Sequence, residues 1–142
     1  MKAVIQRVEN AVLSVDGKVV SQIGLGLAVY LGVEETDTAA DIAPFCKKLA
    51  ALRIFEDENG KLNLSVRDVA GSVMLVSNFT LCGNISHGNR PDFMAAMKPA
   101  PAKLIYEQCV SELNKLVPTV AGVFGADMKI VQSNIGPVTI LY

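Results

Sequence analysis

The sequence is poor in the side chains that most often carry metal-dependent or redox chemistry. Its 142 residues include one histidine, three cysteines and no tryptophan. A single histidine excludes a metal site built on two imidazoles. Three widely spaced cysteines without a C-x-x-C pair favour neither a disulfide framework nor a structural zinc site. We therefore expect reduced thiols, no metal and no cofactor.

The sequence also lacks an excess of positive charge and any long apolar run. Thirteen Lys and Arg against fourteen Asp and Glu give a net charge of −1. This excludes nucleic-acid binding by bulk charge, although not by a local basic patch. No apolar run approaches the roughly 20 residues that a membrane-spanning helix needs. The N-terminal segment has no compact apolar stretch typical of a signal peptide, so we expect a cytoplasmic protein without a membrane partner.

Apolar side chains, in contrast, are abundant. Hydrophobic residues make up 51% of the chain and charged residues 19%, which excludes a disordered protein. A chain of this length buries enough surface for one domain with a core of its own. We expect a single domain over residues 1–142, with apolar surface left for a core or a subunit interface.

Hydrophobic patterning predicts many strands and two helices. Turn signals at Asp16-Gly17 and Asn59-Gly60 mark two hairpins. One helix is expected to end near Leu52, with a start left open between Thr38 and Asp41. The strands are expected at 1–8, 11–15, 18–23, 27–33, 53–55, 72–80, 128–132 and 138–142, and the second helix at 102–117. This predicts an α+β domain with a strongly curved mixed β-sheet or barrel and two main helices.

Common catalytic and nucleotide-binding motifs are absent from the chain. There is no G-x-G-x-x-G after a strand, no P-loop, no G-x-S-x-G and no H-E-x-x-H. Cys82 precedes His87 by five residues, which leaves a cysteine hydrolase as one hypothesis. The alternative is that Cys82 is buried and inert, as free cysteines usually are.

Two short segments are unusual for a strand end and a turn. Ser77–Leu81 (SNFTL) places hydrogen-bonding side chains at the end of an apolar strand, just before a loop rich in Gly and Asn. Asn134–Thr139 (NIGPVT) places a Gly-Pro pair between the two terminal strands, where a proline interrupts the hydrogen-bond ladder.

Together these segments resemble the hallmark motifs of the D-aminoacyl-tRNA deacylases, Ser-Gln-Phe-Thr-Leu and a terminal Asn-x-Gly-Pro-Val-Thr. The similarity extends along the chain. It includes the stretches MKAVIQRV, GLGLAVYLGV, RIF, GKLN, RPDF and ADM. The chain departs from the family at Asn78, where Gln is usual. Phe79 separates it from the related animal enzymes that tolerate L-substrates and carry Pro-Gln-Ala-Thr-Leu.

The resemblance implies an esterase that releases a D-amino acid, or glycine, from the terminal ribose of tRNA and spares L-aminoacyl-tRNA. It implies assistance by the ribose 2′-hydroxyl, so that placement and a polarised carbonyl can replace a strong protein nucleophile. It also implies a homodimer whose sites are completed across the interface.

By resemblance, Thr80 and the backbone amides of Phe79 and Thr80 should lie at the ester carbonyl. Ser77 and Asn78 should shape the adenosine and ester pocket. We expect these four consecutive residues to form the catalytic end of the site.

The remaining roles implied by the resemblance concern discrimination between D and L substrates. Gly136-Pro137 should be a cis pair whose carbonyls enter the partner's pocket and reject an L side chain. Arg7 should brace this segment, and Phe124 and Met128 should line the pocket.

Contacts to the tRNA backbone should come from local basic residues. The alternative to the enzyme is a non-catalytic RNA-binding module of the same fold. In either case the candidate phosphate contacts are Lys47, Lys48, Arg90, Lys98 and Lys103.

Overall fold

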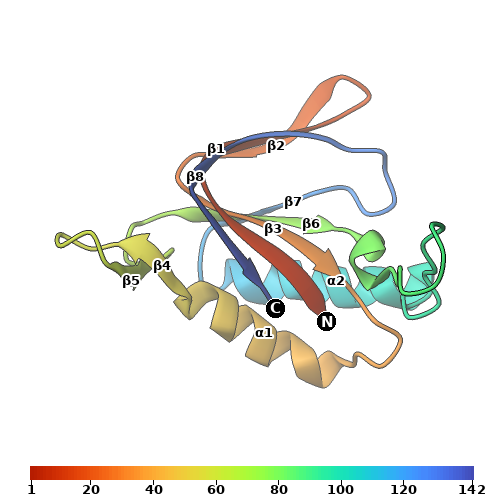
Figure 1. Cartoon of the computed structure of the whole chain (residues 1–142). Helices are drawn as coiled ribbons and strands as arrows, with labels where there is room; N and C mark the ends of the chain where they lie inside the picture. The colour runs from red at the N-terminus through yellow and green to blue at the C-terminus, as the bar shows by residue number, and fades with distance from the viewer.

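The longest strand, β1 (Lys2–Val15), organises the sheet in a computed structural model that describes residues 1–142 (Figure 1). One edge of β1 pairs antiparallel with β8 (Lys129–Leu141). The other edge pairs antiparallel with β3 (Gly26–Gly32) over its first half and with β2 (Lys18–Ile23) over its second half. The first and last strands of the chain are therefore neighbours.

Two parallel pairings extend the sheet and make it mixed. β6 (Ser72–Ser77) runs parallel to β3, and the short β7 (Thr119–Ala121) runs parallel to β6. β2 approaches β6 and β7, so that the sheet curls into a nearly closed barrel. A separate two-stranded sheet, β4 (Arg53–Glu56) with β5 (Leu62–Ser65), extends from the end of the first helix.

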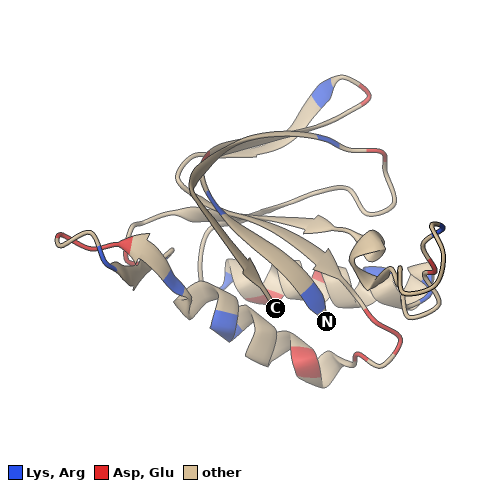
Figure 2. Ribbon diagram, in the orientation of Figure 1, with Lys and Arg blue, Asp and Glu red and all other residues tan.

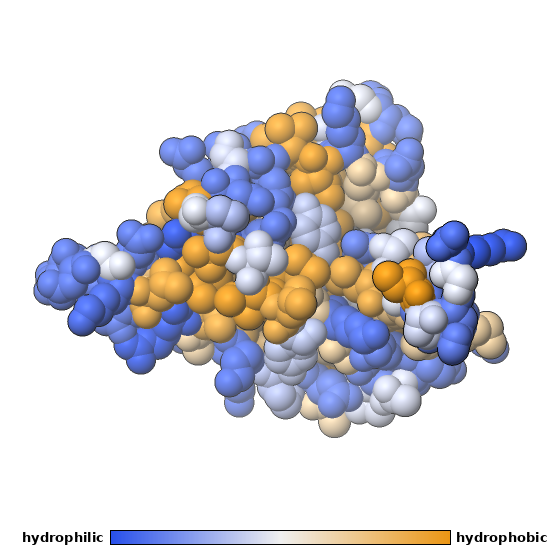
Figure 3. All heavy atoms as spheres, in the orientation of Figure 1, coloured by the Kyte–Doolittle hydropathy of each residue, from blue (hydrophilic) through white to orange (hydrophobic).

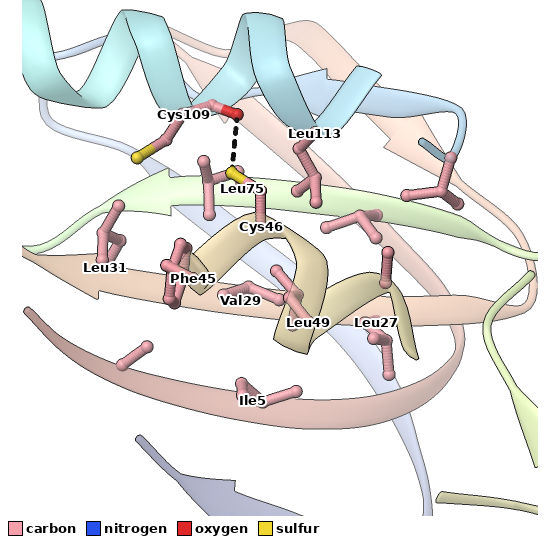
Figure 4. Close-up of a cluster of buried hydrophobic side chains, with 14 of the residues drawn as sticks. Ile5, Leu27, Val29, Leu31, Phe45, Cys46, Leu49, Leu75, Cys109 and Leu113 are labelled. Atoms are coloured by element: carbon pink, nitrogen blue, oxygen red, sulfur yellow. Dashed lines mark hydrogen bonds between the residues drawn. The ribbon is translucent and has the colours of Figure 1, made fainter. Parts of the chain in front are cut away.

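Two helices lie side by side against the sheet (Figure 1). α1 (Ile42–Ala51) buries the apolar residues predicted by their helical spacing: Ile42, Phe45, Cys46 and Leu49. α2 (Pro99–Asn114) packs on α1. Figure 4 shows the contact, in which the thiol of Cys46 donates to the carbonyl oxygen of Cys109 at 3.6 Å.

The start of α1 is set by a cap and a proline. A short 3-10 turn, η1 (Ala39–Asp41), begins at Thr38, whose side chain accepts the Ala40 N–H while Asp41 accepts the Thr38 N–H. The α-helix proper begins at Ile42. Pro44 then falls in the first turn, where its missing N–H has no intrahelical partner to lose.

Alternate residues of the central strands enter two different cores. On β3, Leu27, Val29 and Leu31 face the helices, whereas Ala28 faces the inside of the curved sheet. On β6, Leu75 joins the first core and Met74 the second. Burial on both faces explains why these strands have almost continuous apolar sequences.

The expected α+β fold, with a curved mixed sheet and two main helices, is confirmed, but several predicted boundaries differ. Lys2–Val15 form one strand rather than two, and β7 was not predicted. The strand expected over 72–80 ends at Ser77, because the side chain of Asn78 caps a 3-10 turn, η2 (Phe79–Cys82). The second helix spans Pro99–Asn114 rather than 102–117, since prolines are well tolerated in a first turn.

The C-terminal strands were also predicted as separate, and they form one element. β8 continues through Gly136-Pro137, but its register against β1 shifts there, so the hydrogen-bond ladder is interrupted as the proline requires. No helix of the structure is both long and apolar enough to cross a membrane.

Candidate active site

A pocket of about 810 Å³ opens where the parallel strands β3 and β6 end. The segment that follows β6 forms one wall, and the segment between β7 and β8 forms another. The chain before α2 closes the mouth. The principal residues that line the pocket are Tyr30, Ser77, Asn78, Phe79, Thr80, Phe93, Lys98, Phe124 and Met128.

The polar wall of the pocket is organised by Asn78. Its side-chain oxygen accepts the backbone N–H of Thr80 at 3.2 Å and also accepts the Thr80 hydroxyl. The Thr80 hydroxyl proton is therefore committed to Asn78, and the remaining lone pairs of the exposed Thr80 oxygen stay available. The Thr80 amide, which we expect at the substrate carbonyl, donates to Asn78 in the structure.

Aromatic side chains form the apolar part of the pocket. Phe79 is 58% exposed and meets the ring of Phe93 edge-on, with centroids 5.2 Å apart. On the opposite wall Phe124 packs against Tyr106 at 5.8 Å. The Tyr106 hydroxyl lies within hydrogen-bond distance of the carbonyls of Leu75 and Gly122, at 2.8 and 3.1 Å. Its burial raises the pKa of Tyr106 to about 12.

Gly136 and Pro137 lie away from this pocket, in the irregular part of β8. Both are exposed, and the peptide bond between them is cis. Arg7 lies beneath them with 5% of its surface exposed. Its Nε donates to the carbonyl of Ile135 at 3.3 Å, and its Nη2 pairs with Glu56 at 3.2 Å.

The structure thus sorts the predicted site residues into two groups. One group lines the pocket: Ser77, Asn78, Phe79, Thr80, Phe124 and Met128. Arg7, Gly136 and Pro137 form a second group that does not border the pocket of the same chain.

Tyr30 and Phe93 line the pocket, although neither was predicted as a pocket residue. Tyr30 stands in the near-continuous apolar run of β3, where nothing distinguishes it from the core. Phe93 belongs to the RPDF stretch that carried the family resemblance, so a signal for it existed although no role was attached.

The structure contradicts the cysteine hydrolase hypothesis. Cys82 is buried, its thiol points to the carbonyl oxygen of Val33 at 3.6 Å, and burial raises its pKa. A nucleophilic cysteine needs an accessible thiolate. His87 lies in an exposed loop. No three His, Cys, Asp or Glu side chains come together in a group that could hold a metal ion.

The predicted phosphate contacts are spread over the molecule. Figure 2 shows basic residues on several elements without one dominant basic face. Lys98 borders the pocket, and Lys103 follows it on α2, where it pairs with Glu107 at 3.6 Å. Lys47 and Lys48 lie on α1, and they do not line the pocket.

Comparison with known proteins confirms the resemblance found in the sequence. The sequence profile described as D-Tyr-tRNA(Tyr) deacylase matches residues 4–142. A D-aminoacyl-tRNA deacylase of Persephonella marina is 50% identical over 141 residues, covering 99% of this chain and 96% of the relative. The corresponding protein of Geobacter sulfurreducens is 51% identical over 142 residues, covering 99% of this chain and 93% of the relative.

Solved structures agree with the fold. One named c-Myc DNA Unwinding Element Binding Protein has a TM-score of 0.95 at 40% identity, covering 100% of this chain and 97% of the other. A probable eukaryotic D-amino acid tRNA deacylase has a TM-score of 0.86 at 15% identity, covering 99% of this chain and 97% of the other, which bears on the fold alone. The profile match and the identities near one half extend over essentially the whole sequence. The chain therefore belongs to the D-Tyr-tRNA(Tyr) deacylase family and is a hydrolytic enzyme.

Proposed function

We propose that this enzyme hydrolyses the ester bond of D-aminoacyl-tRNA, and of tRNA mischarged with glycine, to release the amino acid and free tRNA. The observation that carries the proposal is the clustering of Ser77, Asn78, Phe79 and Thr80 on one wall of a pocket at the ends of two parallel strands. The names of its relatives support the same reaction. We propose a cytoplasmic enzyme, because charged tRNA is found in the cytoplasm.

The proposed reaction relies on placement more than on a protein nucleophile. The oxygen of a water molecule bonds to the acyl carbon, and the bond between that carbon and the ribose 3′-oxygen breaks. One water proton ends on the 3′-oxygen, relayed by the neighbouring 2′-hydroxyl of the substrate. The Thr80 oxygen, whose own proton is held by Asn78, can accept a hydrogen bond from the water or the 2′-hydroxyl.

Polarising the ester carbonyl requires N–H donors in the same wall. The amides of Phe79 and Thr80 are the candidates, and the Thr80 amide donates to Asn78 at 3.2 Å. We infer that substrate binding exchanges this bond for one to the ester oxygen.

Rejection of L-aminoacyl-tRNA is assigned to Gly136-Pro137 of the partner subunit in a homodimer. Both residues are exposed and lie outside the pocket of their own chain, so they are free to enter the pocket of a second copy. A backbone wall suits this task because, unlike a side chain, it cannot rotate away from an L substituent.

The dimer itself is supported by apolar surface on the C-terminal strand. Val131 and Leu141 of β8 are 61% and 76% exposed. Figure 3 shows an apolar band across the face that carries the ends of β1 and β8. Surface of this kind is typical of subunit interfaces.

Hydrolysis of matched D-tyrosyl-tRNA and L-tyrosyl-tRNA tests the proposal directly. We expect rapid release of D-tyrosine, little release of L-tyrosine beyond the no-enzyme control, and hydrolysis of glycyl-tRNA. Thr80→Ala should lower the rate on D-tyrosyl-tRNA with a smaller effect on tRNA binding. Failure of the wild-type enzyme to hydrolyse either the D-ester or glycyl-tRNA would contradict the proposal.

The alternative raised by the sequence is a non-catalytic nucleic-acid-binding module, and membership of a deacylase family argues against it. Its one support is the solved structure at 40% identity, which is named c-Myc DNA Unwinding Element Binding Protein. The near-neutral charge of this chain gives it no general affinity for nucleic acid. The same assay separates the two candidates, since a pure binding module has no turnover for Thr80→Ala to remove.

A further inference from the structure

The segment that carries Gly136-Pro137 bulges out of the ladder between β1 and β8. Gln6 of β1 is opposite Thr139, and Val8 is opposite Asn134. Residues 135 to 138 of β8 therefore face only Arg7, so four residues occupy the place of one. A bulge of this size needs contacts other than the ladder to hold its position.

One such contact comes from the buried face of β1. Arg7 donates to the carbonyl of Ile135 at the start of the bulge. Its own guanidinium is fixed by the carbonyl of Ile54 at 3.0 Å and by Glu56 at 3.2 Å. On this side of the bulge, Arg7 is the residue expected to brace the segment.

A second set of contacts holds the bulge from the other face. Gln6 is the neighbour of Arg7 on β1, so its side chain points to the opposite side of the sheet. The Gln6 amide donates to the hydroxyl of Thr139 at 3.3 Å, just after the bulge. Gln132 donates to Asn134, just before the bulge, and to Gln6, both at 2.7 Å.

This polar chain continues into the pocket. The hydroxyl of Tyr30 donates to the side-chain oxygen of Gln132 at 2.8 Å, and Tyr30 lines the pocket. Both donors and the acceptor of the Gln132 amide are thereby engaged, which fixes its orientation. One continuous row of hydrogen bonds links the pocket wall to both ends of the bulge.

We propose that Tyr30, Gln132 and Gln6 are positioning residues for the segment 135–138 and so determine how strongly the enzyme discriminates between D and L substrates. The inference rests on the proposed function, in which this segment forms the wall that rejects L side chains. Arg7 holds the segment from one face of the sheet. The row of hydrogen bonds through Gln6 and Gln132 holds it from the other face. A wall displaced by about 1 Å leaves room for the L side chain that it should exclude. Loss of this row of hydrogen bonds should therefore admit L-esters.

The test measures the ratio of D- to L-tyrosyl-tRNA hydrolysis rates for Tyr30→Phe, Gln132→Leu and the double variant. Each removes hydrogen bonds while keeping side-chain volume, and Tyr30→Phe is the milder change. We expect Tyr30→Phe, which removes one hydrogen bond, to lower the ratio by about fivefold. Gln132→Leu removes three hydrogen bonds and should lower the ratio at least as much. The double variant should fall short of the product of the two single effects, since both act through one network.

Gln22→Leu is the matched control. Gln22 is an exposed residue of β2 whose side chain makes no hydrogen bond within the protein, so its replacement should leave the ratio at the wild-type value. Melting temperatures identify any loss of folding, which alone would lower both rates together and leave the ratio unchanged.

The outcomes distinguish this inference from the function on which it rests. Wild-type discrimination that persists in folded Tyr30→Phe and Gln132→Leu overturns the positioning role and leaves the proposed function intact. A wild-type enzyme that hydrolyses neither ester overturns the proposed function and this inference with it.

Discussion

Asn78 both lines the pocket and binds Thr80, which gives this side chain a local structural role. Its side-chain oxygen accepts hydrogen bonds from the Thr80 amide and from the Thr80 hydroxyl. A shorter side chain than the usual Gln of the family therefore has a definite structural role: it caps η2 and orients Thr80, the proposed catalytic residue.

Asn78→Ala should lower kcat about tenfold while changing KM less, because it frees the Thr80 hydroxyl to rotate. It should also cost about 1 kcal/mol of folding free energy through loss of the cap. Steady-state kinetics and chemical denaturation measure the two effects. Asn78→Gln keeps an amide at this position and should retain more activity than Asn78→Ala; equal activities of the two variants would argue against an orienting amide.

The buried phenol of Tyr106 makes the folding stability depend on pH in the alkaline range. Its pKa is raised to about 12 in the folded protein, against about 10 in an unfolded chain. The folded state thus keeps the proton at a pH where the unfolded state has lost it. The stabilisation is complete below about pH 10 and is lost as the pH rises toward 12.

Tyr106→Phe should be less stable than the wild type by about 1 kcal/mol near neutral pH, because the carbonyls of Leu75 and Gly122 lose a donor. The difference between the two proteins should shrink between about pH 10 and 12. Urea denaturation across this range measures it. A constant difference would show that the phenol titrates alike in both states.

At the scale of elements, local signals predicted some features and failed for others. The Asp16-Gly17 turn was predictable because both residues need positive φ, and they have it at 50° and 75°. The end of β6 was not predictable from local signals, because it depends on the side chain of Asn78 folding back on Thr80. Tyr30 was not identifiable as a pocket residue, because its partner Gln132 lies 102 positions away.

The irregular part of β8 gives a prediction at this scale. Gly136 has φ of +117°, and a Cβ placed there would lie 2.8 Å from the nitrogen of Val138 and 3.2 Å from Arg7. Gly136→Ala should therefore cost about 2 kcal/mol and displace the bulge. We expect a lower melting temperature together with a smaller ratio of D- to L-ester hydrolysis. Gly17→Ala, at an open hairpin turn with no atom within 4 Å, controls for backbone strain alone.

On the scale of the whole molecule, the two groups of site residues are separated within one chain. Thr80 lies in the pocket, whereas Gly136 and Pro137 lie on β8, outside it. If the proposed dimer is correct, each working site combines the pocket of one protomer with the bulge of the other. A heterodimer of two variants can test this arrangement, because one chain carries the altered pocket and the other carries the altered bulge.

Heterodimers of Thr80→Ala and Gly136→Ala chains should regain discrimination. Their only active pocket belongs to the Gly136→Ala chain, and it receives the intact bulge of the Thr80→Ala partner. Tagged heterodimers, purified after co-expression and assayed with D- and L-tyrosyl-tRNA, should show a D-to-L ratio close to the wild type at about half its D-specific rate. If each chain instead supplied its own bulge, the active pocket would face the altered segment, and the ratio would equal that of the Gly136→Ala homodimer.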